Sequence, residues 1–282
     1  MKKKLISIGL AALMVFGIAG CGSSSSSSEA TDANKESAAA AESTVASSEE
    51  KTTFTVGFDQ DFPPMGFVGD DGGYTGFDIE LAEKAAEIMG MEFVPQPIAW
   101  DSKDAELKAG NIDCIWNGFT IQGREDNYTW TEPYLENSQV FVVKKDSGIS
   151  SEADLAGKIV GVQVDSSAEA ALNENTDLSS TFQMQTFSDY NVGLNELASG
   201  SVDAVAMDIV VAGYQLTQRS DGDDLEILDY TIADEEYGIG FLKGNTELRD
   251  KVQDALYQMK EDGTLAEIST EWFGSDITVV GE

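Results

Sequence analysis

The chain has 282 residues, and 41% of them are hydrophobic, which is enough for two modest lobes or one large domain. Its 51 acidic residues against 17 basic ones give a formal net charge of −34, and such a surface repels nucleic acid and anionic headgroups. The sequence contains no histidine, which excludes a Ser-His-Asp or Cys-His mechanism and any histidine-ligated metal site.

The first 20 residues have the pattern of an export signal peptide. Three lysines at residues 2–4 precede an apolar run at 5–19, which is shorter than the roughly 20 residues of a membrane-spanning helix. The end of the run, Ile18-Ala19-Gly20-Cys21, resembles the lipobox of bacterial lipoproteins. This resemblance implies cleavage before Cys21 and a lipid anchor on its sulfur.

Residues 21–51 form a low-complexity segment. Six consecutive serines, Ser23 to Ser28, precede residues that are mostly Ala, Ser, Thr and Glu. This composition offers too little apolar surface to offset the entropy lost on ordering. After the lipidated Cys21 we therefore expect a disordered tether up to residue 51.

The first half of the folded region alternates strand and helix patterns. Alternation and β-branched residues predict a strand from Thr53 to Phe58, and an apolar stripe predicts a helix from Ile79 to Met89. The next expected elements are strand 91–98, helix 103–109, strand 112–116 and a turn at Asn117-Gly118. Because Cys21 has its own role, Cys114 is expected to be a buried hydrophobe without a disulfide partner.

The second half repeats this alternation. The expected elements are strand 140–144, a capped helix at 151–155, strand 158–164, helix 168–173, strand 181–187, helix 190–198, strand 200–207, helix 209–218, a strand through 234–244, helix 247–260 and a closing segment at 263–273. The units Gly110 to Asp113 and Gly200 to Asp203 both lead from a helix into a short strand. Their similarity suggests two α/β lobes of similar build.

The stretch from Gly110 to Tyr134 carries the clearest candidate site. Beyond the turn, Arg124 offers a planar fork of donors suited to one carboxylate, and Thr120 adds a hydroxyl nearby. Together they predict an anion pocket for a small molecule. The stretch alone is also compatible with a surface ion pair between Arg124 and Glu125 or Asp126.

Several motifs resemble those of the polar amino-acid-binding proteins that serve bacterial ABC importers, family 3 of the bacterial extracellular solute-binding proteins. The run GNIDCIWNGFTIQGRE followed by TWTEPY is similar to the segment that holds the ligand's carboxylate in that family. Further matches are Gly57, Asp59, Phe62-Pro63-Pro64, Tyr74, Gly76-Phe77-Asp78, Leu81, Ala82 and the closing runs 245–248, 259–264 and 271–274. The resemblance spans about Thr53 to Gly274.

This resemblance implies an α/β, bilobal periplasmic-binding-protein fold, with two α/β lobes joined by two hinge strands. Lobe 1 would comprise residues 52–137 and 234–275, and lobe 2 residues 138–233. Residues 276–282 would form a tail.

The resemblance also implies a site for the two charged groups of a free amino acid. The groups expected at the carboxylate are Thr120, Arg124, Ser166 and Ser167. The ammonium would be held by Asp208 together with backbone groups near Asn117 and Gly118. Plain helix capping is the alternative role for Ser166, Ser167 and Asp208, because each stands at the start of an expected helix.

The aligned positions for the ligand's side chain are Asp59, Phe62, Asp78, Trp100 and Gln163. Phe62 and Trp100 would sandwich an aliphatic stem, amide or guanidinium, with core packing as the alternative. Two carboxylates and no cation besides Arg124 disfavour an acidic ligand. We expect a polar neutral or basic amino acid, with glutamine, cystine, arginine, lysine and histidine all open.

The function implied is that of an extracytoplasmic, lipid-anchored binding protein. It would capture an amino acid between two closing lobes and deliver it to an ABC permease. We expect a monomer, no metal, no cofactor and no enzymatic activity. The alternatives are a dehydratase on the same fold with Asp59 or Asp208 as general acid, a sensory ectodomain, and a non-binding structural lipoprotein.

Overall fold

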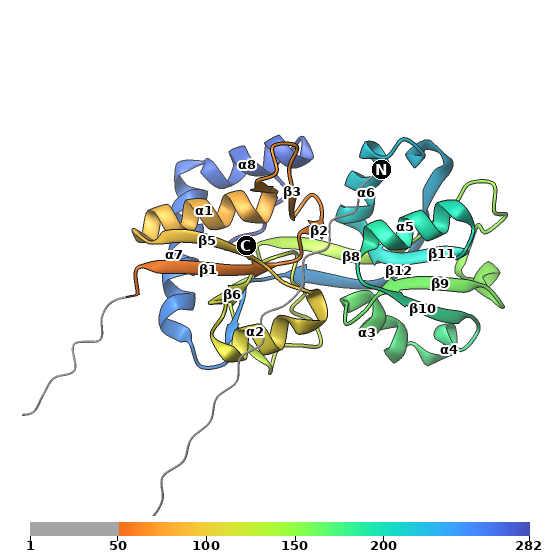
Figure 1. Ribbon diagram of the computed structural model, residues 1–282, viewed down its shortest axis with the longest axis horizontal. Coiled ribbons are helices and arrows are strands. Elements are labelled where there is room, and N and C mark those ends of the chain that lie inside the picture. Colours follow the sequence, from red (N-terminus) through yellow and green to blue (C-terminus); the bar gives the residue numbers. More distant parts are fainter. Residues whose placement is uncertain (1–50) are drawn as a thin grey trace, which may run out of the picture. The chain divides into compact units, whose positions relative to one another are not determined.

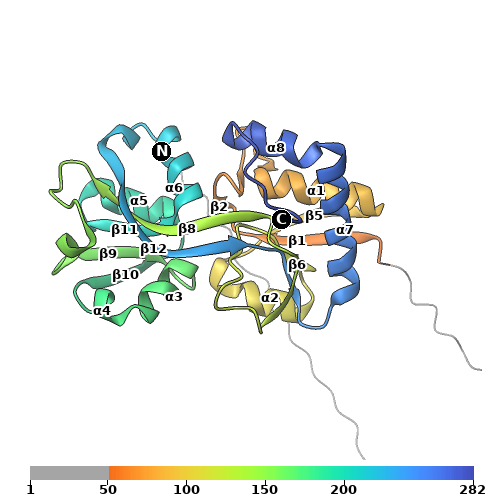
Figure 2. The same ribbon diagram turned by 180° about the vertical axis from the view of Figure 1, so that it is seen from behind.

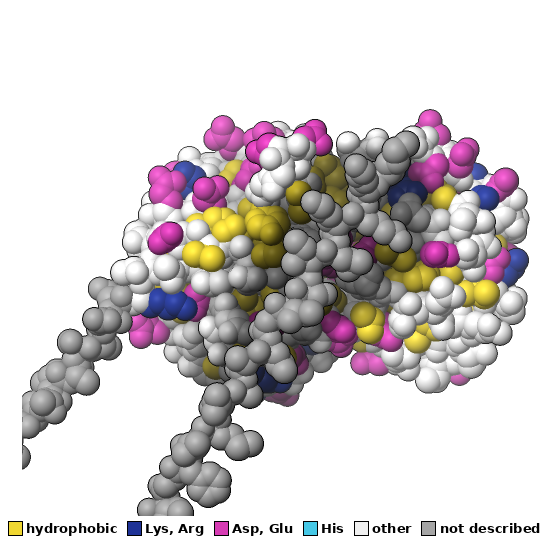
Figure 3. Space-filling model, in the orientation of Figure 1, with side chains coloured by type: hydrophobic (Ala, Val, Ile, Leu, Met, Phe, Trp, Pro, Cys, Tyr) yellow, Lys and Arg dark blue, Asp and Glu magenta, His cyan; other side chains and the backbone are white. Residues whose placement is uncertain are grey.

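The computed structural model describes residues 51–282. The predicted signal peptide, the lipidation site at Cys21 and all but the last residue of the predicted tether lie outside the described residues. The described part contains no helix that is long and apolar enough to cross a membrane. It folds into two α/β lobes (Figure 1), and acidic side chains are spread over both lobes on the face drawn in Figure 3.

Lobe 1 is built on a five-stranded sheet in the order β5-β1-β6-β13-β7. Its strands are β1 (Thr53–Phe58), β5 (Glu92–Pro97), β6 (Cys114–Ile115), β7 (Tyr128–Trp130) and β13 (Gly240–Leu242). Its helices are α1 (Phe77–Met89), α2 (Lys103–Ala109), α7 (Thr246–Asp262) and α8 (Thr264–Phe273). β1 runs parallel to β5 and β6, so the loops that follow these three strands lie at one edge of the sheet.

Lobe 2 is built on a second sheet in the order β10-β9-β11-β8-β12. Its strands are β8 (Leu135–Lys144), β9 (Ile159–Gln163), β10 (Gln183–Phe187), β11 (Ala204–Asp208) and β12 (Leu225–Tyr237). Its helices are α3 (Ser167–Glu174), α4 (Thr176–Ser179), α5 (Tyr190–Ser199) and α6 (Ile209–Gln218). Figure 1 shows α5 and α6 over one face of this sheet and α3 and α4 over the other.

The apolar strands of lobe 2 supply two cores because successive side chains point to opposite faces. On β8, Val140 and Val142 belong to one buried cluster, whereas Phe141 and Val143 belong to another. On β11, the alternating residues 205 and 207 join the first cluster, and 204 and 206 join the second. Burial on both faces explains why these strands read as continuous apolar runs in the sequence.

The strands β8 and β12 connect the lobes (Figures 1 and 2). They pair antiparallel from Leu135 opposite Tyr237 to Lys144 opposite Leu225, with two irregularities in register between Ile227 and Ala233. The predicted lobe boundaries fall inside these two strands. Residues 276–282 return to the start of β8, where the backbone N–H of Val279 donates to the carbonyl of Tyr134 at 3.0 Å.

Several predicted elements have the observed bounds. β1, α2 and α6 span the predicted residues, and the capping box between Ser151 and Asp154 is present at a short 3-10 helix over Glu152–Leu155. Other bounds were wrong. The helix predicted from Ile79 begins at Phe77, and its first turn carries Asp78. The strand predicted at 200–207 starts at Ala204 and includes Asp208.

The single strand predicted through 234–244 is two strands. β12 already starts at Leu225 and ends at Tyr237, and β13 follows after Gly238 and Ile239. The sequence analysis also missed a small sheet of β2 (Asp61–Phe62), β3 (Gly66–Val68) and β4 (Tyr74–Thr75), as well as β7 and α4. These missed elements are two to four residues long, too short to show a periodic pattern.

Candidate functional site

A cavity between the lobes brings together ten of the twelve predicted ligand-binding residues. Its lining consists of Phe62, Trp100, Asn117, Gly118, Thr120 and Arg124 from lobe 1, and Gln163, Ser166, Ser167, Tyr190 and Asp208 from lobe 2. The space between these side chains is about 270 Å³ with the solvent at its mouth included, but only about 10 Å³ of it admits the centre of a water-sized sphere, so the walls lie close together. The predicted residues Asp59 and Asp78 are not part of this lining, and Tyr190 was not predicted.

The turn at Asn117-Gly118 is held from behind by two aspartates. Gly118 has a positive φ of 54°, and a Cβ there would lie 2.9 Å from the Phe62 ring, so the cavity wall requires glycine. Its N–H donates to Asp78 Oδ2 at 2.6 Å. The Asn117 Oδ1 accepts from the backbone N–H of Asp59 at 3.0 Å.

Asp78 does not line the cavity. It is fully buried, and its Oδ2 accepts a second hydrogen bond from the Tyr134 hydroxyl at 2.9 Å. Burial raises the pKa of Asp78 to about 7, against the lowering effect of the Gly118 N–H and Tyr134 hydrogen bonds. The predicted contact between Asp78 and the ligand's side chain therefore does not fit this structure. Asp78 braces the turn that forms the wall.

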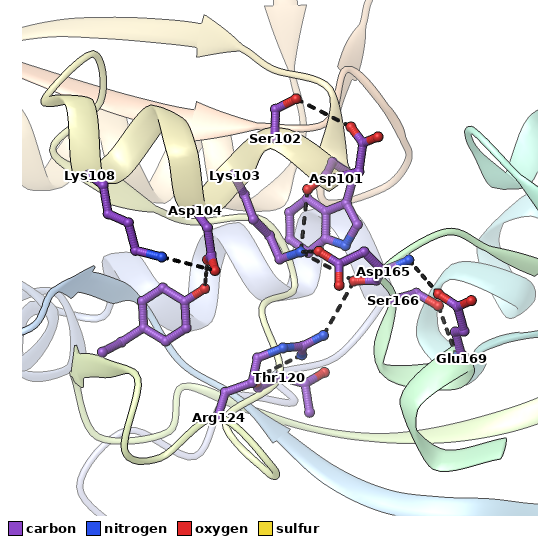
Figure 4. A network of polar contacts seen from close by, with 12 residues as sticks. Asp101, Ser102, Lys103, Asp104, Lys108, Thr120, Arg124, Asp165, Ser166 and Glu169 are labelled. Carbon is purple, nitrogen blue, oxygen red and sulfur yellow. Dashed lines mark hydrogen bonds and ion pairs between the residues drawn. The ribbon is translucent and has the colours of Figure 1, made fainter. Parts of the chain in front are cut away.

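Arg124 points toward lobe 2 and not toward its acidic neighbours in sequence. Its Nη1 donates to the Thr120 carbonyl at 3.3 Å and its Nη2 to the Asp165 carbonyl at 3.5 Å, as Figure 4 shows. The guanidinium carbon lies 5.2 Å from the centre of the Phe119 ring. No carboxylate of the described residues forms an ion pair with Arg124, so the alternative of a surface pair with Glu125 or Asp126 is wrong.

Lys103 is a second cation, which the sequence analysis did not count, and it lies behind the cavity wall, with its ammonium 5.0 Å from the ring centre of Trp100. It is only 2% exposed, and its ammonium contacts the carbonyl of Asp165 at 3.2 Å and forms an ion pair with the Asp165 carboxylate (Figure 4). Burial lowers the pKa of Lys103, while the hydrogen bond to Asp165 raises it. One signal existed, because a lysine in the first turn of a helix opposes the helix dipole.

The lobe 2 wall is formed where strands end and helices begin. Gln163 ends β9 and Asp208 ends β11, and because these strands are parallel their ends meet at one edge of the sheet. Ser166 caps α3, with its Oγ accepting from the Glu169 N–H at 3.1 Å. The Ser167 Oγ accepts from Gln139 Nε2 at 3.0 Å.

Asp208 is a buried anion, and one of its two carboxylate oxygens accepts hydrogen bonds from protein side chains. Its Oδ1 accepts from Tyr237 at 2.6 Å, Gln139 at 2.7 Å and Asn137 at 2.9 Å. Among the hydrogen bonds of residues 51–282, none reaches its Oδ2. Its side chain does not cap α6, so the capping alternative is wrong for Asp208. The remaining oxygen is available to a donor in the cavity.

Glu235 stands beside this aspartate, and the sequence analysis missed it. It is 6% exposed, and its Oε1 accepts from Asn137 Nδ2 at 2.6 Å and from Gln139 Nε2 at 2.7 Å. The pKa of Glu235 is raised to about 7, mainly by burial and secondly by the negative charge of Asp208. The signal that could have identified it is a carboxylate inside the expected strand 234–244.

Aromatic rings form the rest of the lining. Phe62 lies 5.8 Å from Tyr190 and Trp100 lies 5.5 Å from Phe119, measured between ring centroids. The hydroxyl of Tyr190 is buried and has no hydrogen-bond partner in the described residues. Tyr190 begins α5 just after β10, at the same sheet edge as Gln163, and that position was the signal that could have identified it.

Asp59 and Gln163 join the two lobes at the cavity's side. Gln163 Nε2 donates to Asp59 Oδ2 at 2.7 Å and to the Ser188 carbonyl at 3.0 Å. Burial raises the pKa of Asp59 to about 6, against the lowering effect of hydrogen bonds from Asp61 and Gln163. In this closed arrangement the Asp59 carboxylate accepts a hydrogen bond from Gln163 of lobe 2, and Asp59 does not line the cavity.

Residues 54–275 match the family of bacterial extracellular solute-binding proteins, family 3. The chain belongs to this family. Its bilobal fold is the predicted periplasmic-binding-protein fold, and a solved family structure supports that assignment. An ABC uptake transporter substrate-binding protein from Streptococcus pneumoniae with bound histidine superposes with a TM-score of 0.78 at 36% identity, covering 81% of this chain and 95% of that one.

Two relatives of this family 3 chain are named for the amino acids that they bind. The L-cystine-binding protein TcyJ of Escherichia coli (strain K12) is 34% identical over 233 residues, which cover 82% of this chain and 86% of TcyJ. The arginine-binding extracellular protein ArtP of Bacillus subtilis (strain 168) is 29% identical over 274 residues, covering 96% of this chain and 98% of ArtP. Both relatives are named as binding proteins.

Proposed function

We propose that this chain is the amino-acid-binding component of an ABC importer. Its cavity would hold the ligand's carboxylate with Arg124 and Thr120, and its ammonium with Asp208. The observation that carries the proposal concerns the contacts among residues 51–282: a guanidinium without an ion pair on one wall and a carboxylate oxygen without a hydrogen bond on the other both line one small cavity. A free amino acid carries the two complementary charges a few ångströms apart.

The ligand class that fits best is a polar neutral or basic amino acid. Lys103 is the second cation, but Asp165 already neutralises it, so it offers no charge to an acidic ligand side chain. Asp59 and Glu235 add acidic groups next to the cavity. The relatives named for cystine and arginine, and the structure with bound histidine, agree with this class.

Ligand binding would stabilise the closed arrangement of the lobes. Contacts already cross the cleft from Gln163 to Asp59 and from Lys103 and Arg124 to Asp165. A ligand that touches both Arg124 and Asp208 adds contacts that only the closed form can make, which is the differential affinity that closure requires. The permease would then distinguish the loaded form by its shape.

The remaining partners follow from the family and the N-terminal sequence. The family is extracellular, and we propose that Cys21 anchors the chain to the outer face of the cell membrane through its lipid. We further propose that it works as a monomer beside its permease.

A thermal-shift screen of the purified protein tests the proposal. The twenty amino acids, cystine and ornithine would be added one at a time, with calorimetry on every hit. Ligand at 100 times Kd stabilises a folded protein by about 2.7 kcal/mol, a readily measured rise in the midpoint. We expect a clear shift with one polar neutral or basic amino acid, and the absence of any shift across the panel would contradict the proposal.

A further inference from the structure

Two buried carboxyl groups share the same donors at the hinge. In the order β11-β8-β12, Gln139 of β8 pairs with Asp208 of β11, and Asn137 of β8 pairs with Glu235 of β12. Each amide nitrogen donates to both acids. Asn137 Nδ2 lies 2.9 Å from Asp208 Oδ1 and 2.6 Å from Glu235 Oε1, and Gln139 Nε2 lies 2.7 Å from each.

Both carboxyl groups lie within 2.9 Å of the same two amide nitrogens, so they are neighbours in a buried site. Burial raises the pKa of Asp208, and hydrogen bonds from Tyr237, Gln139 and the Glu235 side chain lower it. Two neighbouring buried carboxyl groups repel each other when both are ionised, which favours a proton on one of them. Asp208 Oδ1 has three donors and Glu235 Oε1 has two, so the additional bond from Tyr237 favours the anion on Asp208. The proton therefore belongs on Glu235.

The other groups around the pair do not supply this proton. Tyr237 of β12 and Tyr190 of α5 are buried, and burial raises the pKa of both well above 10, so they stay neutral. Arg124 lines the same cavity as Asp208. Asp234 and Glu236 flank Glu235 on β12, where Ser138 and Gln122 hydrogen-bond them.

We propose that Glu235 is a positioning residue for the ligand's ammonium, which holds Asp208 through the two shared amides and releases a proton when the ammonium binds. The proposal rests on the proposed function, namely that the cavity takes a free amino acid. A positive charge at the free oxygen of Asp208 stabilises the ionised form of Glu235 and so expels its proton.

Proton release makes ligand affinity depend on pH in a defined direction. A reaction that releases a proton is favoured as pH rises, so Kd should fall as pH increases. The pKa of Glu235 without ligand is about 7. Below that value we expect affinity to rise up to tenfold per pH unit, and above it to level off.

Calorimetry of the full chain with the amino acid found in the screen tests this coupling. At about pH 6.5, the binding enthalpy is measured in buffers that differ in ionisation enthalpy, and the slope gives the number of protons released. We expect the wild-type protein to release between half a proton and one proton. Glu235→Gln should still bind, release none through this residue, and lose most of the pH dependence.

Two controls separate the pair from neighbouring acids. Glu236→Gln changes the adjacent, partly exposed residue and should release as many protons as the wild type. Asp59→Asn removes another buried acid, whose pKa is about 6. The difference from the wild type gives the number of protons that Asp59 itself releases on ligand binding. Ligand binding without proton release in the wild type, or equal release in Glu235→Gln, would overturn the inference.

Infrared spectroscopy of the ligand-free protein tests the protonation of Glu235 independently of any ligand. At about pH 6.5 the wild type should show the carbonyl band of a protonated buried carboxyl that Glu235→Gln lacks, with Asp59→Asn and Asp78→Asn identifying other bands in that region. A spectrum unchanged by Glu235→Gln would overturn the inference even if no amino acid binds. A screen without hits overturns the proposed function, so the two failures are distinguishable.

Discussion

The two walls of the cavity present opposite charges and are built in different ways. On lobe 1, Arg124 and the Asn117-Gly118 turn belong to the segment between β6 and β7, which buried groups such as Asp78 hold from behind. On lobe 2, Gln163 and Asp208 are the last residues of two parallel strands. The lobe 1 wall is cationic, and a backbone turn gives it its shape. The lobe 2 wall is anionic, and it is formed by side chains at the ends of neighbouring strands.

This difference explains why one ligand would close the cleft. Within the part of the chain that the structure describes, the lobe 1 wall has a guanidinium that forms no ion pair, and the lobe 2 wall has a carboxylate oxygen that accepts no hydrogen bond. Buried charges are costly unless they are paired, so each wall is incomplete until an oppositely charged group arrives. A zwitterion supplies both groups at once and therefore favours the arrangement in which both walls touch it.

Removing the charge from either wall should have the largest effect on binding. We expect Arg124→Ala and Asp208→Ala each to weaken ligand affinity by about 1,000-fold, about 4 kcal/mol, because each leaves one charge of the ligand buried without a partner. Calorimetry measures both. The controls Lys108→Ala on lobe 1 and Asp229→Ala on lobe 2 remove exposed charges and should bind as the wild type does. Loss in only one of the two site variants would contradict the two-wall account.

The support behind the lobe 1 wall should make stability depend on pH. The pKa of Asp78 is raised by burial from its ordinary value of 3.8 to about 7. As pH rises from about 4 to about 7, the unfolded chain loses this proton and the folded chain keeps it. The contribution of Asp78 to the free energy of unfolding therefore falls with rising pH, by about 4 kcal/mol in total.

Denaturant unfolding of Asp78→Asn at several pH values checks this sign. The variant should show a flatter decline of stability across that window than the wild type does. Asp126→Asn, on the exposed loop before β7, provides the matched control and should retain the wild-type slope. A decline as steep in Asp78→Asn as in the wild type would show that other acids cause it.

A smaller effect on ligand affinity is expected from removing the direct contact between the two lobes that Lys103 and Asp165 form. Lys103 is buried, whereas the side chain of its partner Asp165 is 58% exposed. Lys103→Met removes a contact across the cleft and a buried charge, and leaves Asp165 free to return to water. We expect a larger radius of gyration in ligand-free solution scattering, affinity weaker by about tenfold, and an unfolding midpoint that does not fall. Unchanged scattering and unchanged affinity together would exclude Lys103 from closure.

The smallest effect concerns the hydroxyl of Tyr190. It is buried beside the cavity and has no partner in the part of the chain that the structure describes. Tyr190→Phe should therefore leave the unfolding midpoint unchanged or raise it, and should weaken ligand binding a few-fold, about 1 kcal/mol, if a polar group of the ligand satisfies this hydroxyl. A clear loss of stability without any loss of affinity would assign the hydroxyl a purely structural role.

The sequence was informative wherever the site depends on local motifs. The positions of Thr120, Arg124 and Asp208 follow from a strand-turn segment and a strand-helix junction, and the structure brings all three to one cavity. Their contact with a ligand remains a prediction. The start of α1 was misplaced because Gly76 caps it without a side-chain hydrogen bond, so no capping residue marks that end.

Contacts between distant segments could not be predicted in the same way. Lys103 meets Asp165 across 62 positions of sequence. Glu235 and Asp208 lie on strands β12 and β11, on either side of β8. They come together because the side-chain amides of two β8 residues donate to both acids. Such pairs depend on sheet order and register, which periodicity in a single sequence does not reveal.

A crystal structure of the protein with the amino acid found in the screen tests the two-wall account most directly. The account predicts closed lobes, with the ligand's carboxylate hydrogen-bonded to Arg124 and Thr120 and its ammonium hydrogen-bonded to the free Oδ2 of Asp208. A ligand bound with the reverse orientation, or one held by a single lobe with Asp208 Oδ2 still without a donor, would contradict it.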